Sequence, residues 1–358
     1  MWLHKLRLSN FKNHKKVEVE LPQGWVCITG DNGVGKSNIL DAVWYLANSR
    51  SYFNNLDQQL ILHDSPGFSI KAEFVNDVPI EIACRLESGK RKQVLLNDVP
   101  VRKLSQYLGT IPVVMITPFD IGLILDGSEE RRRFIDTALC KVYPEYLQAL
   151  DNYKRALESR NKQLKAFAKS GKRDVELLES YDMVLIKNTP IIYDYRSKFV
   201  AELIQYFRPV YAKLSGDIEK AEMVYVSQIK ERTMAEWLAM QLEKDLILER
   251  TTKGVHQDDL DFLIHGFYVK KYGSQGQTKS FVIAMQIALY EWLREKKGVA
   301  PILLLDDIYE KIDAGRAASL MQIIHDLKPQ QVIVTDSHKE RVQKNIAHFE
   351  GEHFFWDM

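Results

Sequence analysis

Residues 30–37 read G-x-x-x-x-G-K-S, with two glycines, a lysine and a serine at fixed spacing. They follow a short apolar run, residues 25–29, and precede an apolar stretch from Ile39 to Ala47. This order predicts a strand, a glycine-rich loop and a helix, an arrangement that directs free backbone N–H groups towards the phosphates of a nucleotide. The residues of this predicted phosphate-binding loop are Gly30, Asp31, Asn32, Gly33, Val34, Gly35, Lys36 and Ser37. We expect the Lys36 ammonium to bridge the β- and γ-phosphate oxygens.

Overall composition excludes some classes of protein. The 358 residues carry a formal net charge of +1, so any nucleic-acid contact must come from local basic patches. The three cysteines, Cys27, Cys84 and Cys140, are far apart, which favours a reduced, cytoplasmic setting over a disulfide framework. The N-terminus lacks the apolar core of a signal peptide, and no apolar run reaches membrane-spanning length. We therefore expect a cytoplasmic protein with no membrane partner.

Apolar periodicity predicts an α/β protein that is interrupted by helices. Strict alternation at residues 68–74 and 80–86 predicts strands, and the apolar run at residues 302–305 predicts a buried strand. Apolar residues at three- and four-residue spacing from Tyr146 to Leu185 indicate a helical hairpin. The predicted architecture is a nucleotide-binding lobe of residues 1–118 and 259–358, split by a mostly helical insert lobe of residues 119–258.

Two carboxylates, Asp306 and Asp307, directly follow the apolar run at residues 302–305. A buried strand that ends in two acidic residues is typical of a Walker B element. The first, Asp306, would hold Mg²⁺ together with the Ser37 hydroxyl, and Asp307 would orient or deprotonate the attacking water. The alternative is a strand that ends in a solvated acidic turn, and the phosphate-binding loop favours the catalytic interpretation. The predicted catalytic set is Lys36, Asp306 and Asp307.

Residues 274–277 read S-Q-G-Q and precede a predicted helix that extends to Trp292. Together with the phosphate-binding loop and L-L-L-D-D, this string resembles the signature loop of ABC-type ATPase heads, which normally reads S-G-G-Q. The resemblance implies mixed β-sheets with helices around the phosphate-binding loop, and ATP with Mg²⁺ as cofactors. It also implies that Ser274 and Gly276 contact the γ-phosphate of ATP bound to a second subunit. Gln275 and Gln277 would belong to the same nucleotide-binding signature loop.

Spacing between these motifs indicates the branch of the superfamily. Most of the chain separates Lys36 from Asp306, whereas transporter ATPase subunits keep the two motifs close together. The opening L-R-L-S-N-F-K-N-H, residues 6–14, resembles the L-x-x-F-R-N start of SMC and RecF heads, and the chain is too short for SMC arms. Residues 96–101, 116–121, 131–136 and 270–277 are similar to segments of the RecF family, as are residues 303–307, so the resemblance covers essentially the whole chain. Phe119 departs from that family's pattern, as does Y-E-K-I-D after Asp307.

Resemblance to RecF, a family of bacterial recombinational repair proteins, implies a detailed function. The chain would form an ATP-dependent homodimer on double-stranded, gapped DNA, with RecR and RecO as partners that help place RecA. It would be a weak DNA-dependent ATPase, and slow hydrolysis would release the DNA. Asp313 resembles the D-loop aspartate or caps a helix, and Asp120 could replace an absent glutamine. His338 could replace the histidine that ABC heads place beyond Walker B, although Thr335 and Asp336 lie nearer the usual position.

Two basic stretches are candidates for contact with DNA phosphates. Charge alone favours solvated faces, and the resemblance to RecF reverses that preference. The first, which we expect to lack acidic partners, contains Lys5, Arg7, Lys12, Lys15 and Lys16. The second, on the first arm of the hairpin, contains Lys154, Arg155, Arg160, Lys162, Lys165, Lys169, Lys172 and Arg173. Arg131, Arg132 and Arg133 are either structural or couple the nucleotide to the arm.

Three other functions remain open. An SMC-like ATPase or the ATPase half of a nuclease is one, although no second acidic domain follows Asp313. A transporter's ATPase subunit is another, and the large insert argues against it. A binding module with an inactive nucleotide site is the third, and the intact Lys36, Ser37, Asp306 and Asp307 argue against that one.

Overall fold

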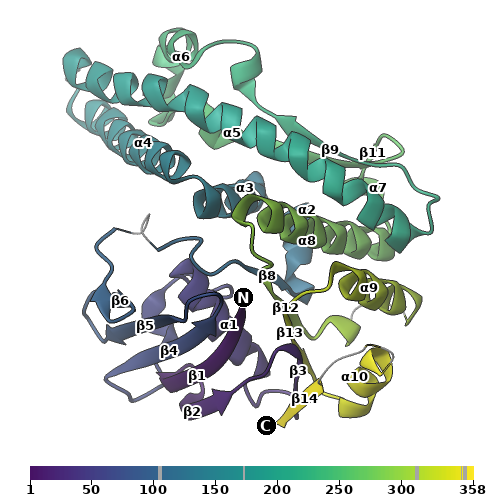
Figure 1. The fold of residues 1–358 in the computed structure, drawn as a ribbon. Helices are drawn as coiled ribbons and strands as arrows, with labels where there is room; N and C mark the ends of the chain where they lie inside the picture. The colour runs from purple at the N-terminus through teal and green to yellow at the C-terminus, as the bar shows by residue number, and fades with distance from the viewer. Residues whose placement is uncertain (104–106, 172–173, 311–313, 348, 350–352) are drawn as a thin grey trace. The chain divides into compact units, whose positions relative to one another are not determined.

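The computed structural model describes residues 1–103, 107–171, 174–310, 314–347, 349 and 353–358 (Figure 1). The chain forms two compact units. The head unit contains Met1–Ile121, Tyr206–Glu219 and Gln275–Met358, and the insert unit contains Gly122–Gln205 and Lys220–Ser274. Within the described residues, no helix is both long and apolar enough to cross a membrane.

A five-stranded parallel sheet forms the centre of the head unit. Its strands in spatial order are β14 (His353–Asp357), β3 (Gly24–Thr29), β13 (Gln331–Asp336), β12 (Ile302–Asp306) and β8 (Val113–Ile116). Residues of β8, β12 and β13 are buried throughout, which explains why these strands are continuous apolar runs in the sequence. The strand predicted at residues 302–305 is therefore confirmed. Strands β12 and β13 pair in register, so that Asp306 lies beside Thr335 at their carboxyl ends.

A six-stranded antiparallel sheet forms a second layer of the head unit. Its strands in spatial order are β2 (His14–Glu20), β1 (Trp2–Phe11), β4 (Gly67–Val75), β5 (Ile80–Glu87), β6 (Gln93–Leu96) and β7 (Val99–Pro100). Along β4 the residues alternate between buried and half-buried, so the alternation at residues 68–74 correctly predicted a strand. Helix α1 (Lys36–Asn48) joins both sheets in one hydrophobic core, which contains Ile39 and Val43 of α1, Ile70 of β4 and Leu304 of β12.

Four further helical elements complete the part of the head unit that bears on the site. They are η3 (Pro118–Ile121), α8 (Gln275–Lys297), η6 (Ile308–Glu310) and α9 (Ala314–Leu327). Almost every residue of α8 from Thr278 to Leu293 is buried, and Phe281 packs on Phe207, with ring centroids 4.6 Å apart. Phe207 belongs to the end of α5 (Val175–Ser215), so the last turns of that long helix belong to the head unit.

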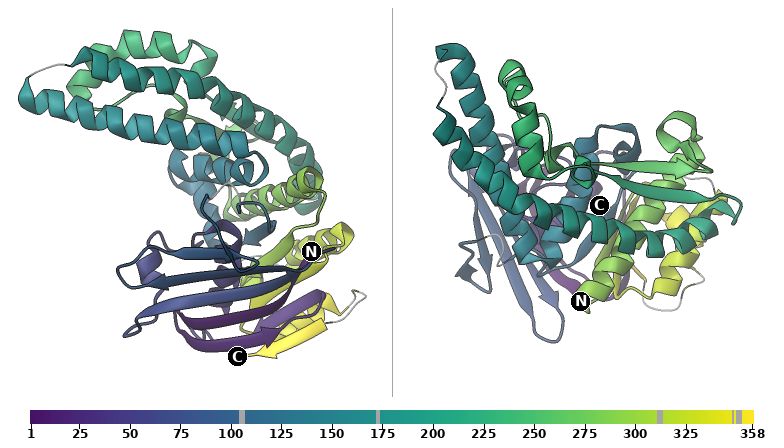
Figure 2. Two further views of the ribbon diagram at one scale, coloured as in Figure 1. Left: turned by 60° about the vertical axis from the view of Figure 1, so that its left-hand side comes forward. Right: turned by 90° about the horizontal axis from the view of Figure 1, so that it is seen from above.

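The insert unit contains the predicted helical hairpin. Helices α4 (Pro144–Ser170) and α5 run alongside each other, and Gly171 ends α4 in the left-handed conformation with φ 66° (Figure 2). The remaining described elements are α2 (Gly122–Leu125), α3 (Ser128–Val142), β9 (Ala221–Val226), η4 (Gln228–Lys230), α6 (Met234–Leu248), η5 (Val255–Gln257), β10 (Asp259–Ile264), β11 (Phe267–Tyr268) and α7 (Val269–Tyr272).

The predicted end of the insert at residue 258 is wrong. Strand β10, which we expected to return to the nucleotide-binding lobe, pairs with β9 and β11 in a three-stranded antiparallel sheet of the insert unit. Residues 259–274 therefore belong to the insert unit, whereas Tyr206–Glu219 belong to the head unit. Strand partners far apart in sequence decide this boundary, and local alternation carries no information about them.

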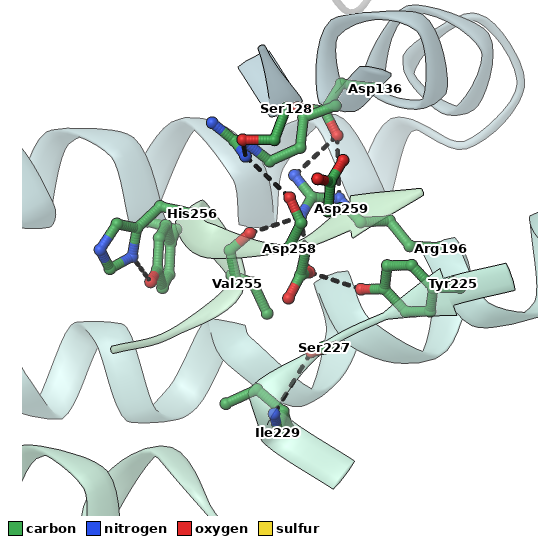
Figure 3. A network of polar contacts seen from close by, with 12 residues as sticks. Ser128, Asp136, Arg196, Tyr225, Ser227, Ile229, Val255, His256, Asp258 and Asp259 are labelled. Carbon is green, nitrogen blue, oxygen red and sulfur yellow. Dashed lines mark hydrogen bonds and ion pairs between the residues drawn. The ribbon is translucent and has the colours of Figure 1, made fainter. Parts of the chain in front are cut away.

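A buried polar network holds the insert's helices to its sheet (Figure 3). Arg196 of α5 donates to Asp136 of α3 at 2.9 Å, to Asp258 at 2.8 Å and to the Val255 carbonyl at 2.6 Å. Tyr225 of β9 donates to Asp258 as well. Burial raises the pKa of Asp258, and the adjacent Arg196 guanidinium opposes that rise. Because every charge in the network has a partner, α3, α5, β9 and the start of β10 are fixed together.

Candidate nucleotide-binding site

The phosphate-binding loop joins β3 to α1, as the order of strand, glycines and helix predicted. Gly30, Gly33 and Gly35 have φ angles of 149°, 87° and 109°, a region that residues with a Cβ rarely adopt. A Cβ on Gly33 would meet no atom within 4 Å, so the space above the loop is open there. A Cβ on Gly35 would lie 2.5 Å from the Asn13 side chain and 2.6 Å from His14 Nε2, so a residue other than glycine would displace these two side chains.

Lys36 begins α1 and is buried, with its side chain folded back over the loop. Its Nζ donates to the carbonyl oxygens of Gly30 at 2.9 Å and Asp31 at 3.0 Å. In a nucleotide complex, phosphate oxygens would replace these two carbonyl oxygens as partners of the ammonium. The ammonium is therefore already held at the centre of the loop, where a nucleotide would need it.

Asp306 lies at the end of β12, where the structure brings it together with Ser37 and Lys36. Its carboxylate accepts hydrogen bonds from the Thr335 hydroxyl, at 2.8 Å, and from the Ser37 hydroxyl. Burial raises the pKa of Asp306, while these hydroxyls and the Lys36 charge oppose that rise. Hydroxyl and carboxylate oxygens are ligands that Mg²⁺ prefers, so the pair Ser37 and Asp306 fits that ion. Elsewhere in the described ranges, no cluster of three or more His, Cys, Asp or Glu could hold a metal.

Asp307 adopts a left-handed backbone with φ 43°, which turns the chain sharply after β12. Its N–H donates to the Thr335 hydroxyl at 3.1 Å. Thr335 therefore contacts both acidic residues of the motif. Of the three positions considered as replacements for the ABC histidine, Thr335 is the one in contact with Asp306. His338 is exposed at the start of α10 (Lys339–Ile346), and its N–H donates to the buried Asp336 at 2.6 Å.

The turn between β1 and β2 holds the phosphate-binding loop in place. Asn13 Nδ2 donates to the Val34 carbonyl at 2.9 Å, and His14 Nε2 lies 3.0 Å from the Gly35 carbonyl oxygen. Burial lowers the pKa of His14, so its neutral form is favoured. Residues 6–14 were interpreted as a family marker and, at Arg7 and Lys12, as part of a basic patch, and this supporting role of Asn13 and His14 was not predicted. The missed signal was Asn-Phe-Lys-Asn-His, a polar turn in a strand pair that precedes the loop.

Several basic residues of the N-terminal patch have acidic partners, contrary to our expectation. Lys5 pairs with Glu20 at 2.7 Å, Arg7 pairs with Glu18 at 3.0 Å, and Lys12 pairs with the buried Asp41 of α1 at 2.6 Å. Glu18 and Glu20 lie on β2, which pairs with β1, and Asp41 lies on α1, so strand pairing and helix packing bring these acids to the basic residues. Lys15 and Lys16 are exposed, and neither forms an ion pair within the described residues.

Asp120 occupies the position proposed to replace a glutamine. Its carboxylate accepts hydrogen bonds from the Tyr52 hydroxyl, from the Thr117 N–H at 2.7 Å and from the Gln286 side chain. Burial raises the pKa of Asp120 to about 7. Tyr52 also donates its backbone N–H to Asp41 at 2.7 Å, so hydrogen bonds connect α1 with η3.

The signature loop, residues 274–277, leads into α8. Ser274 and Gln275 are exposed, Gly276 faces the Arg316 guanidinium of α9, and Gln277 donates to Glu219 at 2.8 Å. Their contact with ATP of a second subunit stays a prediction. Asp313, the D-loop candidate, lies outside the described residues, as do Lys172 and Arg173.

Arg160 does not belong to a DNA-binding surface. Although it lies on the predicted basic arm, it is fully buried and bonds Asp182 at 2.6 Å and Asp245 at 2.7 Å. Arg155 and Lys162 are exposed but pair with acids one helical turn away on α4, whereas Lys165 and Lys169 are exposed without an ion pair among the described residues. Only part of the predicted arm is therefore free to attract phosphates.

Arg131 and Arg132 have structural roles inside the insert unit. Arg131 makes a bidentate pair with Asp259, at 2.5 and 3.1 Å, and Arg132 donates to the Ser128 hydroxyl and the Asp258 carbonyl, both at 2.7 Å. These contacts join α3 to the start of β10. They favour the structural interpretation of this arginine cluster.

Comparison with known proteins extends what the geometry indicates. The family model described as RecF/RecN/SMC N terminal domain matches residues 2–352. A relative from Flavobacterium johnsoniae, named DNA replication and repair protein RecF, is 38% identical over 344 residues, which cover 96% of each chain. The chain belongs to the RecF family. A RecF relative from Phocaeicola vulgatus is 34% identical and covers 99% of this chain and 95% of its own.

Solved structures give the same family and fold. The structure of the recombination mediator protein RecF-ATPrS in the RecFOR pathway matches this RecF chain with a TM-score of 0.89 and 26% identity, and covers 100% of this chain and 96% of its own. An SMC head bound to the C-winged helix domain of ScpA matches with a TM-score of 0.57 and 15% identity, and covers 96% and 92%. This RecF chain therefore has the α/β fold of the ABC-type ATPase heads, with mixed sheets and long helical segments.

Proposed function

We propose that this RecF-family chain is an ATP-dependent DNA-binding protein of recombinational repair. Two subunits would close on double-stranded DNA near a single-strand gap when both hold ATP, and slow hydrolysis would release the DNA. RecO and RecR are the expected partners, with RecA as the protein to be placed on the gap. The observation that carries the proposal is the meeting of Lys36, Ser37 and Asp306 in a chain that is RecF-like over its whole length.

ATP with Mg²⁺ fits the residues of the site. The open space above Gly33 and the positive backbone angles of the loop suit a phosphate chain. Lys36 would exchange the carbonyl oxygens of Gly30 and Asp31 for β- and γ-phosphate oxygens. Mg²⁺ held by Ser37 and Asp306 would neutralise charge that develops on the phosphates during hydrolysis.

Hydrolysis would need a water that is held in line with the γ-phosphate. Asp307 is the expected base, because it follows Asp306 directly and its backbone is turned by the Thr335 hydrogen bond. Backbone N–H groups from Asn32 to Lys36 would cradle the phosphates through bond cleavage to ADP and phosphate. Ser274 and Gly276 of the second subunit would complete the site, so hydrolysis would be slow in the monomer.

ATP would favour the dimer by mass action, because it makes contacts in the closed dimer that it lacks in the monomer. DNA would bind through phosphate contacts that are independent of sequence and weakened by salt. Lys15, Lys16, Lys165 and Lys169 are the basic residues from the two predicted patches that are exposed and lack ion pairs within the described part of the chain.

The test uses Asp307→Asn protein, which should bind ATP without hydrolysing it. Particle mass and retention of gapped duplex DNA are measured with ATP, with ADP and without nucleotide, all with Mg²⁺. We expect ATP alone to convert monomers to dimers and to trap DNA. Adding Ser274→Arg should abolish both effects and leave ATP binding by the monomer intact.

Two controls sharpen this experiment. Lys36→Ala should remove ATP binding itself, which separates loss of the nucleotide from loss of the dimer contact. If the Asp307→Asn protein binds ATP, yet neither its mass nor its DNA retention changes, the proposed function is refuted.

A further inference from the structure

The guanidinium of Arg316 lies directly against Gly276 of the signature loop. A Cβ built on Gly276 would lie 2.8 Å from the Arg316 Cζ and 3.0 Å from its Nη2. Arg316 belongs to the first turn of α9 and is half-buried, and Gly276 belongs to the first turn of α8. The missing side chain at position 276 is therefore what allows a cationic group to reach the backbone of the signature loop.

The electrostatic surroundings of Arg316 favour an additional anion. The first turns of two helices carry partial positive charge, so α8 and α9 do not stabilise a guanidinium placed beside both. A nearby acid is Glu219, which already accepts hydrogen bonds from Gln277 at 2.8 Å and from the Tyr211 hydroxyl. Burial and Glu219 raise the pKa of Tyr211, and the positive charge of Arg316 opposes that rise. Glu219 therefore already has two hydrogen-bond donors near the positive charge of Arg316.

We propose that Arg316 binds the γ-phosphate of ATP held by a second subunit when that phosphate reaches Gly276. This inference rests on the proposed function, in which residues 274–277 meet the partner's nucleotide. An arginine fork can hold two phosphate oxygens at once, and charge-assisted bonds of this kind are stronger than bonds between neutral groups. Since ADP has no γ-phosphate, Arg316 would make dimerisation depend on ATP rather than on any bound nucleotide.

The first test replaces Arg316 in the Asp307→Asn background, so that hydrolysis does not obscure binding. The readouts are the ATP concentration at half-maximal dimer formation, ATP affinity of the monomer and the midpoint of thermal unfolding. Arg316→Gln should raise the ATP concentration required for dimers at least about tenfold, and Arg316→Lys should recover part of the loss. Lys279→Gln, which removes a positive charge one turn further along α8, is the matched control and should leave it unchanged.

ATP affinity of the monomer distinguishes action on the second subunit from action within one chain. Arg316→Gln should leave that affinity unchanged, because Arg316 is proposed to contact only the ATP held by the other subunit.

Failure of the inference can be separated from failure of the proposed function. If Asp307→Asn protein does not dimerise with ATP, both are refuted. If it dimerises and Arg316→Gln has the same ATP dependence, only the role of Arg316 is refuted. A loss of ATP affinity by the Arg316→Gln monomer also refutes that role, because Arg316 then acts on the ATP of its own subunit.

Discussion

Replacing Arg160 by methionine is the sharpest test of the insert's internal packing. Arg160 is fully buried on α4 and donates to Asp182 at 2.6 Å, Asp245 at 2.7 Å and the Thr251 hydroxyl at 2.9 Å. Methionine retains much of the side-chain volume and removes the charge. The carboxylate of Asp245, which is 1% exposed, then loses the Arg160 guanidinium and keeps its hydrogen bonds from Thr252.

The expected cost is about 3–5 kcal/mol of unfolding free energy at pH 7, the range for breaking a buried ion pair by removing one partner. The cost should shrink as the pH falls from 7 to 5. Burial already raises the pKa of Asp182, and Arg160 opposes that rise, so removing the arginine raises the pKa further. A carboxyl group whose pKa is higher in the folded state destabilises the fold above its unfolded pKa, and this penalty disappears as protons bind.

Urea unfolding of the wild-type and Arg160→Met proteins at pH 7 and pH 5 gives the loss of unfolding free energy and its change with pH. Hydrogen exchange of α4 and α6 locates the effect in the insert unit. Arg155→Met on the exposed face of α4 is the matched control, with an expected change within about 0.5 kcal/mol. If Arg160→Met costs no more than this control at pH 7, or if its cost grows on acidification, the reasoning about the buried pair is refuted.

Three other predictions concern the head unit. Gly276→Ala should weaken ATP-dependent dimerisation, measured as particle mass, without reducing ATP binding by the monomer, because a Cβ would displace Arg316. Gly127→Ala is the control and should leave the mass unchanged, because a Cβ there meets no atom within 4 Å. Asp120→Asn should remove a pH dependence of the unfolding free energy. Because the pKa of Asp120 is about 7 in the folded protein, the wild-type unfolding free energy should fall from pH 4 to pH 7 relative to that of the variant. Urea unfolding that gives the same pH dependence for both proteins would contradict this. Replacing both Lys15 and Lys16 by glutamine should weaken DNA retention and lower its salt dependence. Lys5→Gln should have a smaller effect, since Lys5 is paired with Glu20, and equal losses would contradict a DNA-contacting role for Lys15 and Lys16.

Local patterns predicted which segments form the centre of the candidate site, and the nucleotide-binding roles of its residues stay predictions. The glycines and lysine of the phosphate-binding loop, and the acidic pair after β12, lie within short segments whose spacing reflects backbone geometry. Their meeting follows from parallel strands that end at one edge of a sheet. The support that α1 and the turn at Asn13 give to the phosphate-binding loop depends on contacts between segments that are separate in sequence. A single sequence does not reveal such contacts.

The burial of Arg160 could have been predicted from the helical period of α4. Apolar residues on α4 recur at Tyr146, Leu150, Tyr153 and Leu164, and Arg160 falls on the same helical face. Charge suggested an exposed residue, whereas the helical period indicated a buried one. The insert's second boundary was a different kind of error, because alternation at residues 259–264 predicts a strand correctly and says nothing about its sheet.

The strand order of the parallel sheet has a consequence for protein synthesis. Strand β3, which leads into the phosphate-binding loop, has β13 and β14 as its neighbours, and these are the last strands of the chain. A ribosome that adds about 5–20 residues per second needs roughly 15–60 s to pass from the loop to these strands. During that interval the loop lacks its supporting sheet, so the nascent chain should remain unable to bind ATP. A truncated polypeptide that ends before residue 331 would therefore be unable to compete with the finished protein for the nucleotide.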